Sequence, residues 1–213
     1  MDPTSAQASD DFPTTTYIAL LRGINVGAQK PIKMTELKQL FEAQGFGRVQ
    51  TYIQSGNVVF TADCAEEPLR RQLEREIAAA FGFPVTVALR AADELERLIA
   101  QCPFAADALR DEESLYVSLL AEAPAQAGID RLLGRGSDVD ELRLVGREVY
   151  LLLRQSIRLT LFTNAFLERT LGVPATARNW RTISKLGELG RAMSRDAAAA
   201  AGGASSVPTP VAD

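Results

Sequence analysis

Apolar residues occur in short runs and helical stripes that alternate in a regular order along the chain. In the first half this pattern predicts a strand, a helix, a two-stranded hairpin, a helix, a strand and a helix. These elements are expected at residues 17–22, 35–44, 50–54, 57–61, 69–81, 84–90 and 91–101. Thr35 is the expected N-cap of the first helix, and Gly82 is expected to end the second. The order βαββαβ is that of the ferredoxin-like pattern.

The second half repeats the order as βαββα, at residues 116–120, 128–133, 141–145, 148–153 and 163–171. Its first run, Tyr116 to Leu120, echoes Tyr17 to Leu21. We therefore expect an α+β fold of two tandem ferredoxin-like subdomains with antiparallel sheets. The expected organisation is a disordered tail, a first subdomain, a connection, a second subdomain with the C-terminal helix, and a disordered tail, at residues 1–15, 16–102, 103–113, 114–193 and 194–213.

The strands also carry information about burial. In the run from Tyr17 to Leu21, and again from Val149 to Leu153, both alternating sets of side chains are apolar. A sheet that is open to water on one face alternates apolar and polar positions. We therefore expect both faces of each sheet to be covered, by helices on one side and by the other subdomain or another protomer on the other.

Charge and hydropathy argue against several classes of partner. The 213-residue chain has a net charge of −4 and a pI of about 5.1. An acidic chain has no overall attraction for nucleic acid or for an anionic membrane, so neither is expected as a partner. The N-terminal residues lack the basic and apolar regions of a signal peptide, and no apolar run approaches the ~18 residues of a membrane span. The expected location is the cytoplasm.

The chain contains no histidine. Ser-His and Cys-His nucleophile pairs and His-ligated metal sites are therefore excluded. The two cysteines, Cys64 and Cys102, have no metal-ligand spacing, so no His- or Cys-based metal site is expected and no cofactor is identified. We expect two free thiols.

Two loop stretches form the candidate site, the loop 22–33 and the hairpin 54–57. In a ferredoxin-like sheet the third strand lies antiparallel beside the first, so we expect this loop and this hairpin to be in contact. Arginine, lysine and backbone N–H groups in such a place suit a phosphate or carboxylate. The candidate ligand-binding residues are Arg22, Asn25, Gly27, Lys30, Gln54, Ser55 and Asn57. Gly and Asn are also ordinary turn residues, so a purely structural role is the alternative.

A third stretch, Arg178, Asn179 and Trp180, opens the last predicted helix and completes the list of candidates. Asn179 is the expected N-cap, and Arg178 is left for solvent or a ligand. Trp180 either packs in the core or lies beside the site. Whether this stretch reaches the first two is left open.

These three stretches carry a family resemblance. The runs Arg22-Gly23-Ile24-Asn25-Val26-Gly27, Gln54-Ser55-Gly56-Asn57 and Arg178-Asn179-Trp180 resemble the bacterial proteins grouped as domain of unknown function 1697. The resemblance covers roughly residues 15–191. It implies two ferredoxin-like subdomains and no assigned activity, so it implies no catalytic residues.

Three functions are compatible with the sequence. The first is a protein that binds a small anionic ligand at the edge formed by the loop 22–33 and the hairpin 54–57, with any reaction on that ligand left open. The second is an RNA-binding module, which Val58-Val59-Phe60 on a ferredoxin-like sheet faintly resembles. The third is a structural or oligomerisation protein whose loops are only turns.

Overall fold

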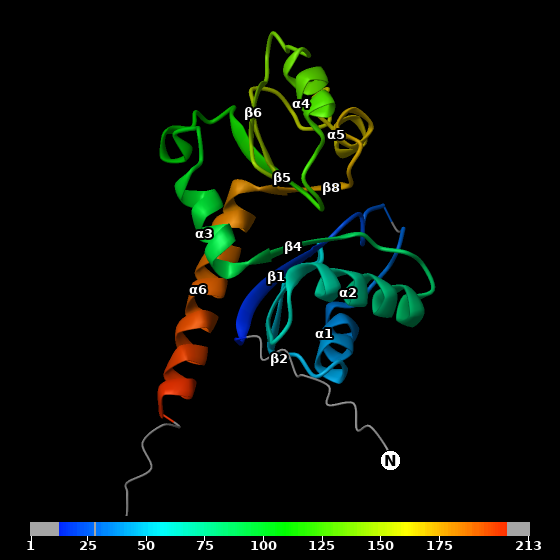
Figure 1. The fold of residues 1–213 in the computed structure, drawn as a ribbon. Coiled ribbons are helices and arrows are strands. Elements are labelled where there is room, and N and C mark those ends of the chain that lie inside the picture. Colours follow the sequence, from blue (N-terminus) through cyan, green and yellow to red (C-terminus); the bar gives the residue numbers. More distant parts are fainter. Residues whose placement is uncertain (1–12, 28, 204–213) are drawn as a thin grey trace, which may run out of the picture.

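The structure is a computed structural model that describes residues 13–27 and 29–203, and it consists of two α+β units stacked against each other (Figure 1). Each unit has a four-stranded antiparallel sheet, with strand order β2-β3-β1-β4 in the first and β6-β7-β5-β8 in the second. The elements are β1 (Thr15–Leu21), α1 (Met34–Ala43), β2 (Gly47–Tyr52), β3 (Asn57–Ala62), α2 (Glu66–Phe81), β4 (Val87–Ala91), α3 (Ala92–Ala100), a 3-10 turn (Ala106–Ala108), β5 (Ser114–Leu120), α4 (Gln126–Leu133), β6 (Glu141–Val145), β7 (Glu148–Leu153), α5 (Asn164–Leu171), β8 (Ala175–Asn179) and α6 (Trp180–Gly203).

The expected pairing of the first and third strands is confirmed in both units. Tyr17 lies opposite Phe60 in the antiparallel pair β1–β3, and Val117 lies opposite Tyr150 in the pair β5–β7. Gly82 ends α2 in a left-handed conformation with φ +78°, as the sequence predicts.

Both faces of the first sheet are covered, which explains why the part of β1 from Tyr17 to Leu21 is apolar on both faces. Tyr17, Ala19 and Leu21 pack under α1 and α2 in one hydrophobic cluster. The alternate residues Ile18 and Leu20 pack on the opposite face in a second cluster. That second cluster contains residues of α3 and α6 together with Val117, Leu119 and Tyr150 of the second sheet, so it also joins the units.

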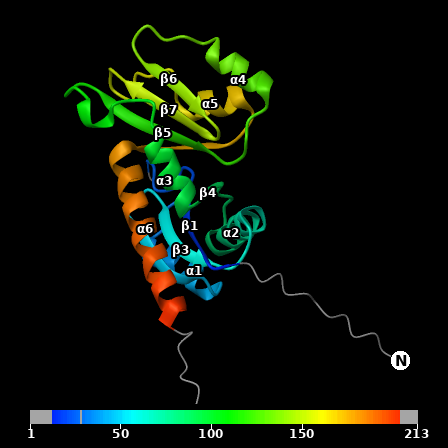
Figure 2. The same cartoon turned by 60° about the vertical axis from the view of Figure 1, so that its left-hand side comes forward.

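The C-terminal helix departs from the predicted domain organisation. Although α6 follows the second unit in sequence, it runs back along the first unit beside α3 (Figure 2). Ile183 and Leu186 are fully buried in the cluster that it shares with Ile18. The sequence also predicted a disordered tail from residue 194, and this prediction was wrong because α6 continues to Gly203. Residues 1–12 and 204–213 of the two expected tails lie outside the described residues.

Three local predictions were wrong. The strand β8 was missed, although it completes the second sheet by pairing with β5. Lys33, not Thr35, stands at the N-cap of α1 and provides no side-chain cap. The hairpin between β2 and β3 turns over residues 53–56 because Ile53 leaves the strand with φ +46°.

None of the helices within the described residues is both long enough and apolar enough to cross a membrane.

Candidate functional site

The loop 22–33 and the hairpin 54–57 are in direct contact, which confirms the sequence-based prediction. The Asn25 side-chain Nδ2 donates a hydrogen bond to the Gln54 carbonyl at 2.8 Å. The Leu21 backbone N–H donates to the Gly56 carbonyl, also at 2.8 Å. The hairpin is therefore bound to the end of β1 and to the loop that follows it.

Asn25 closes this loop internally. Its Nδ2 also donates to the Ile32 carbonyl at 2.9 Å, and its Oδ1 accepts from the Ile32 N–H at 2.9 Å. Asn25 has φ +55°, a left-handed conformation that asparagine adopts more readily than most residues. The amide of Asn25 thus holds the two ends of the loop together and against the hairpin.

Arg178 reaches the same place from the second unit, but as a buried residue. Its side chain was expected to face solvent or a ligand, and this expectation is corrected because the residue is only 8% exposed. The guanidinium donates to the carbonyls of Leu21 at 2.9 Å and Ser55 at 2.8 Å, and to the Asn57 Oδ1 at 2.7 Å. Burial lowers the pKa of Arg178 to about 10, so the group remains a cation at neutral pH.

Arg90 makes the corresponding contacts in the opposite direction. It occupies the fourth position of β4, as Arg178 does in β8, and it is 1% exposed. Its Nη2 donates to the Leu120 carbonyl at the end of β5 at 2.8 Å, just as Arg178 donates to Leu21 at the end of β1. The two units therefore exchange equivalent arginines across a pseudo-twofold contact.

The two arginines differ in their charged partners. The Arg90 Nε donates to Glu148, the first residue of β7, at 2.9 Å. The Arg178 Nε donates to the neutral Asn57, the first residue of β3. Burial lowers the pKa of Arg90 and Glu148 opposes that shift, whereas burial alone acts on the pKa of Arg178. Within the described part of the chain, Arg178 is therefore a buried cation whose hydrogen-bond acceptors are all neutral.

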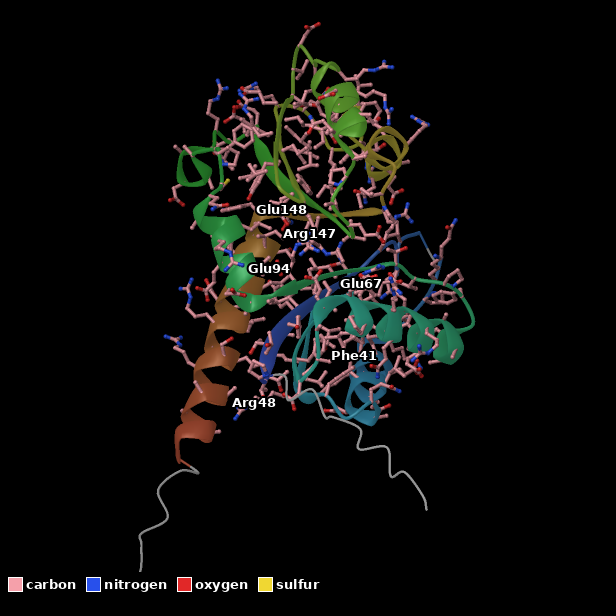
Figure 3. All side chains as sticks on the ribbon, in the orientation of Figure 1. Phe41, Arg48, Glu67, Glu94, Arg147 and Glu148 are labelled. Atoms are coloured by element: carbon pink, nitrogen blue, oxygen red, sulfur yellow. The ribbon has the colours of Figure 1, made fainter. Side chains whose placement is uncertain are left out.

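Further ion pairs join the units. Arg22, half exposed, pairs with Glu168 of α5. Arg147 pairs with Glu66 at 2.6 Å and with Glu94 at 3.1 Å, and Figure 3 shows Arg147 and Glu94 where the two units meet. The hydrogen bonds that Arg147 donates to Glu66, together with the negative charges around it, raise the pKa of Arg147. Of the candidate site residues, Arg22 therefore already has a carboxylate partner in Glu168.

Most of the other candidates also have partners within the protein. The Asn57 Nδ2 donates to the Ser55 Oγ at 3.0 Å and to the Tyr52 carbonyl at 3.0 Å. The Lys30 Nζ donates to the Pro84 carbonyl at 2.7 Å. Gly27 lies beside the bridge between Val26 and Gln29, with φ +55° and open space around it.

The remaining two candidates lie where α6 begins, Asn179 at the end of β8 and Trp180 as the first residue of the helix. The Asn179 Oδ1 accepts from the Thr182 N–H at 2.9 Å, which confirms its predicted capping role. Trp180 packs against the second hydrophobic cluster, and it lines a different hollow together with Ile99 and Phe104. The structure therefore places Arg178 against the loop and the hairpin. Asn179 instead caps α6, and Trp180 lines a different hollow.

A polar groove of about 530 Å³ opens where the loop, the hairpin and the start of α1 meet. We call it the α1 groove, and its lining is Asn25, Pro31, Ile32, Lys33, Met34, Thr35, Glu36 and Gln54. The first N–H groups of a helix have no partner within the helix, and here no side chain caps them. Lys33 and Glu36 form an exposed pair at 3.0 Å at its rim.

The sequence prediction missed the part of this groove that belongs to α1. Lys33 occupies the N-cap position, where Ser, Thr, Asp or Asn usually caps a helix. A lysine at this position is the sequence signal that the N–H groups of the first turn have no side-chain cap. Buried Arg90 was also missed, although it repeats the position of Arg178.

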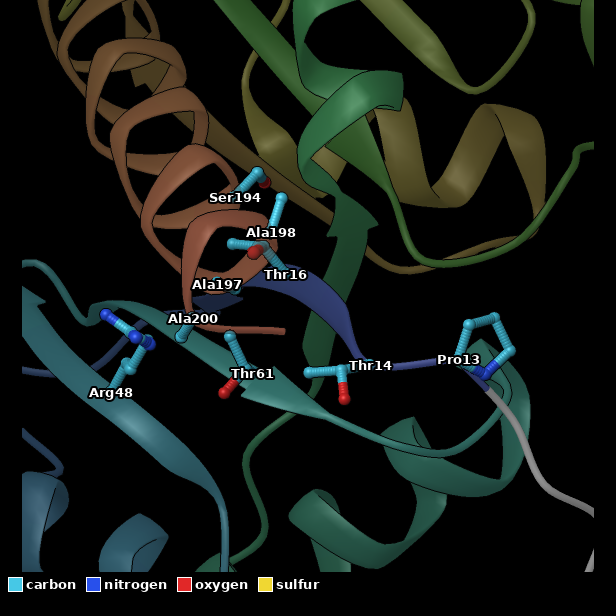
Figure 4. A pocket seen from close by; sticks show the side chains of 9 residues that line it. All are labelled: Pro13, Thr14, Thr16, Arg48, Thr61, Ser194, Ala197, Ala198 and Ala200. Carbon is cyan, nitrogen blue, oxygen red and sulfur yellow. The ribbon is translucent and has the colours of Figure 1, made fainter. Parts of the chain in front are cut away.

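A second hollow, of about 450 Å³, lies between the C-terminal half of α6 and the other end of the first sheet (Figure 4). Threonine and serine hydroxyls and alanine methyls form most of its wall, and among the described residues Arg48 is the one charged side chain that lines it. The motif residues lie at the opposite end of β1, so we do not take this hollow as the candidate site.

The thiols are free and offer little reactivity. Cys64 and Cys102 form no disulfide, as expected, and burial raises the pKa of each thiol. A raised pKa leaves less of the nucleophilic thiolate at neutral pH. Within residues 13–27 and 29–203, no group of three or more His, Cys, Asp or Glu side chains is placed to hold a metal ion.

Comparison with known proteins identifies the family. A solved structure, that of the conserved bacterial protein SP0830 from Streptococcus pneumoniae, is similar over 84% of this chain and 99% of its own, with a TM-score of 0.64 and 22% identity. At that identity the likeness shows the fold alone. No curated protein matches. The model of the family described as "Protein of unknown function (DUF1697)" matches residues 14–150, and the chain therefore belongs to that family.

Proposed function

We propose that the protein binds a small anionic ligand, a phosphate or a carboxylate, in the α1 groove. The observation that carries the proposal is the uncapped N-terminus of α1, whose first residues are part of the lining of the groove. Backbone N–H groups and the positive end of the helix dipole favour an anion at such a position. The Lys33 amine and the exposed Gln54 amide stand at the rim to add further hydrogen bonds.

The buried charge of Arg178 supports the same proposal. It lies directly behind the hairpin, bonded to the Ser55 carbonyl, and no carboxylate among the described residues pairs with it. A cation in a poorly solvated interior is screened less than one in water. The charge of Arg178 therefore stabilises an anion bound in the neighbouring α1 groove without direct contact.

Backbone conformation around the groove is also unusual. Asn25, Lys30 and Ile53 all have left-handed φ angles, and Ile53 is β-branched. Such conformations cost free energy and occur often where a loop is shaped for a ligand. We place Arg22, Ser55, Asn57 and Arg178 outside the direct contacts of the ligand, because each already has partners within the protein.

The experiment is a titration of isotopically labelled protein with inorganic phosphate and with citrate, followed by the amide resonances of Met34, Thr35 and Glu36. We expect these resonances to shift in the wild-type protein. Lys33→Ala should weaken the binding, and Glu36→Gln should strengthen it by removing a negative charge from the rim. Lys38→Ala is the matched control, since Lys38 forms a similar exposed pair with Glu42 on the same helix. Unchanged resonances at millimolar concentrations of both anions would refute the proposal.

A purely structural role for the motifs is the second candidate function. It is favoured by the reciprocal contacts of Arg90 and Arg178, which join the two units without any ligand. An RNA-binding sheet is not favoured, because helices and the other unit cover both faces of the first sheet. The phosphate titration distinguishes anion binding in the α1 groove from a purely structural role.

We also propose that each unit is ferredoxin-like and that the protein is cytoplasmic. The order β2-β3-β1-β4, with two helices on one face, supports the first assignment. The two free thiols support the second.

A further inference from the structure

The second unit contains a hollow of about 400 Å³ between α4 and α5. We call it the arginine hollow, and its lining is Arg131, Arg135, Phe166, Arg169 and Thr170. Three of these five residues are exposed arginines, in a chain whose net charge is negative. The ring of Phe166 forms the apolar part of the wall, and it is partly buried against the core of the unit.

These arginines lack the partners that most arginines of this protein have. Many arginines elsewhere pair with carboxylates on the surface and between the units, as Arg97 does with Asp93 and Arg147 does with Glu66. Across residues 13–27 and 29–203, none of the three arginines of the hollow forms an ion pair with a carboxylate. Glu168, beside Arg169 in sequence, is held by Arg22 and by the Ala175 N–H.

The packing of the two helices sets the positions of these side chains. Gly128 of α4 lies so close to α5 that a Cβ atom there would be 3.0 Å from the Leu171 carbonyl oxygen. One turn later, the Arg131 Nη2 donates to the Thr170 carbonyl at 3.0 Å. Arg131 is therefore held against α5 on the side where Arg169 stands.

Helix dipoles favour cations at this place. Arg131 and Arg169 lie in the last turns of α4 and α5, and Arg135 follows the end of α4. The dipoles are those of backbone carbonyls and provide no carboxylate partner for these side chains. The equivalent helices of the first unit, α1 and α2, are joined instead by Gln44, Gln72 and Glu76. The arginines are thus a particular feature of the second unit.

We propose that the arginine hollow binds a small oxyanion that carries several negative charges, as phosphate or carboxylate groups. A guanidinium presents parallel N–H groups that match the oxygens of either group. Three such cations without carboxylate partners repel one another, and a multivalent anion removes that repulsion. The volume suits a small molecule, and Phe166 offers an apolar wall to the rest of it.

The test is isothermal titration calorimetry of the full chain with pyrophosphate, tripolyphosphate and citrate. Every titration is repeated in the Lys33→Ala background, so that failure of this site and failure of the α1 groove are separable. Arg135→Gln and Arg169→Gln should each weaken binding by roughly tenfold or more, since each removes a charge-assisted contact. Arg158→Gln, which changes another exposed arginine without an ion pair among the described residues, should leave the affinity within about twofold.

Binding of the phosphates alone assigns the site to phosphate groups, and equal binding of citrate assigns it to oxyanions in general. Both results support the proposal when the two hollow variants lose affinity and Arg158→Gln does not. Failure of all three probes to bind at millimolar concentration would overturn it. Equal losses in all three arginine variants would also overturn it, because they would show a nonspecific effect of net charge.

Discussion

Removal of the Arg178 side chain tests whether this residue joins the two units. In Arg178→Met the side chain keeps a similar length but provides no donor, so its acceptors in the first unit lose their partner. The Leu21 carbonyl and the Asn57 Oδ1 are buried contacts of this guanidinium, at 2.9 and 2.7 Å. Each buried acceptor without a partner costs about 1–3 kcal/mol, so the two together cost about 2–6 kcal/mol.

Part of this loss is offset by relief of the desolvated charge. Burial lowers the pKa of Arg178 to about 10, so the folded protein holds the cation at a cost that Arg178→Met removes. The expected net decrease in the free energy of unfolding is therefore in the lower part of the range, about 2–4 kcal/mol. For a chain of this size that corresponds to a fall in Tm of roughly 4–16 °C.

Urea denaturation and thermal melts measure this change. Arg181→Met is the matched control, because Arg181 lies three positions later, is exposed, and should change stability by less than about 0.5 kcal/mol. Arg178→Lys should recover little, since an ammonium group lacks the planar array of donors that reaches several acceptors. A midpoint for Arg178→Met equal to that of Arg181→Met would show that Arg178 does not hold the units together.

Three further predictions concern stability. Asn25→Ala should cost about 2–3 kcal/mol, because three hydrogen bonds and a left-handed conformation depend on it, whereas Arg22→Ala should cost less than about 1 kcal/mol. A larger fall in Tm for Arg22→Ala than for Asn25→Ala would contradict this assignment of roles. Gly56→Ala should be far more destabilising than Gly23→Ala in urea denaturation, because both have positive φ but only at Gly56 would a Cβ lie 2.6 Å from Ile24. Hydrogen bonds from Arg110 hold the pKa of Glu113 at about 2. The ionised Glu113 therefore stabilises the folded protein above pH 4.5, and this contribution is lost as the pH falls toward 2. In an acid titration, Glu113→Gln should lose less stability than the wild-type protein over that interval.

The sequence predicted those features that depend on local pattern. The double-sided apolar run of β1 predicted a sheet covered on both faces, because each residue's side chain needs an apolar neighbour wherever it points. Glycine at position 82 predicted the end of α2 through its tolerance of a positive φ. The contact between Asn25 and Gln54 followed from the pairing of β1 with β3.

Features that depend on tertiary contacts were not predictable in the same way. The segment Ala175–Asn179 contains no β-branched run, and it becomes a strand because the edge of β5 pairs with it. An arginine at position 178 is usually exposed, and only the carbonyls of the other unit make its burial favourable. The groove at α1 likewise depends on how the hairpin folds against the loop.

The repeat itself separates structural residues from candidate functional ones. Arg90 and Arg178 occur at equivalent positions and make equivalent contacts, so the joining of the units accounts for both. The connection from β1 to α1 spans residues 22–33, whereas the connection from β5 to α4 spans only residues 121–125. Stacking the two units does not require the longer connection, since the shorter one serves the second unit. The extra residues build one wall of the α1 groove and carry Lys33, and this break in the repeat is the reason to look for a ligand there rather than at the buried arginines.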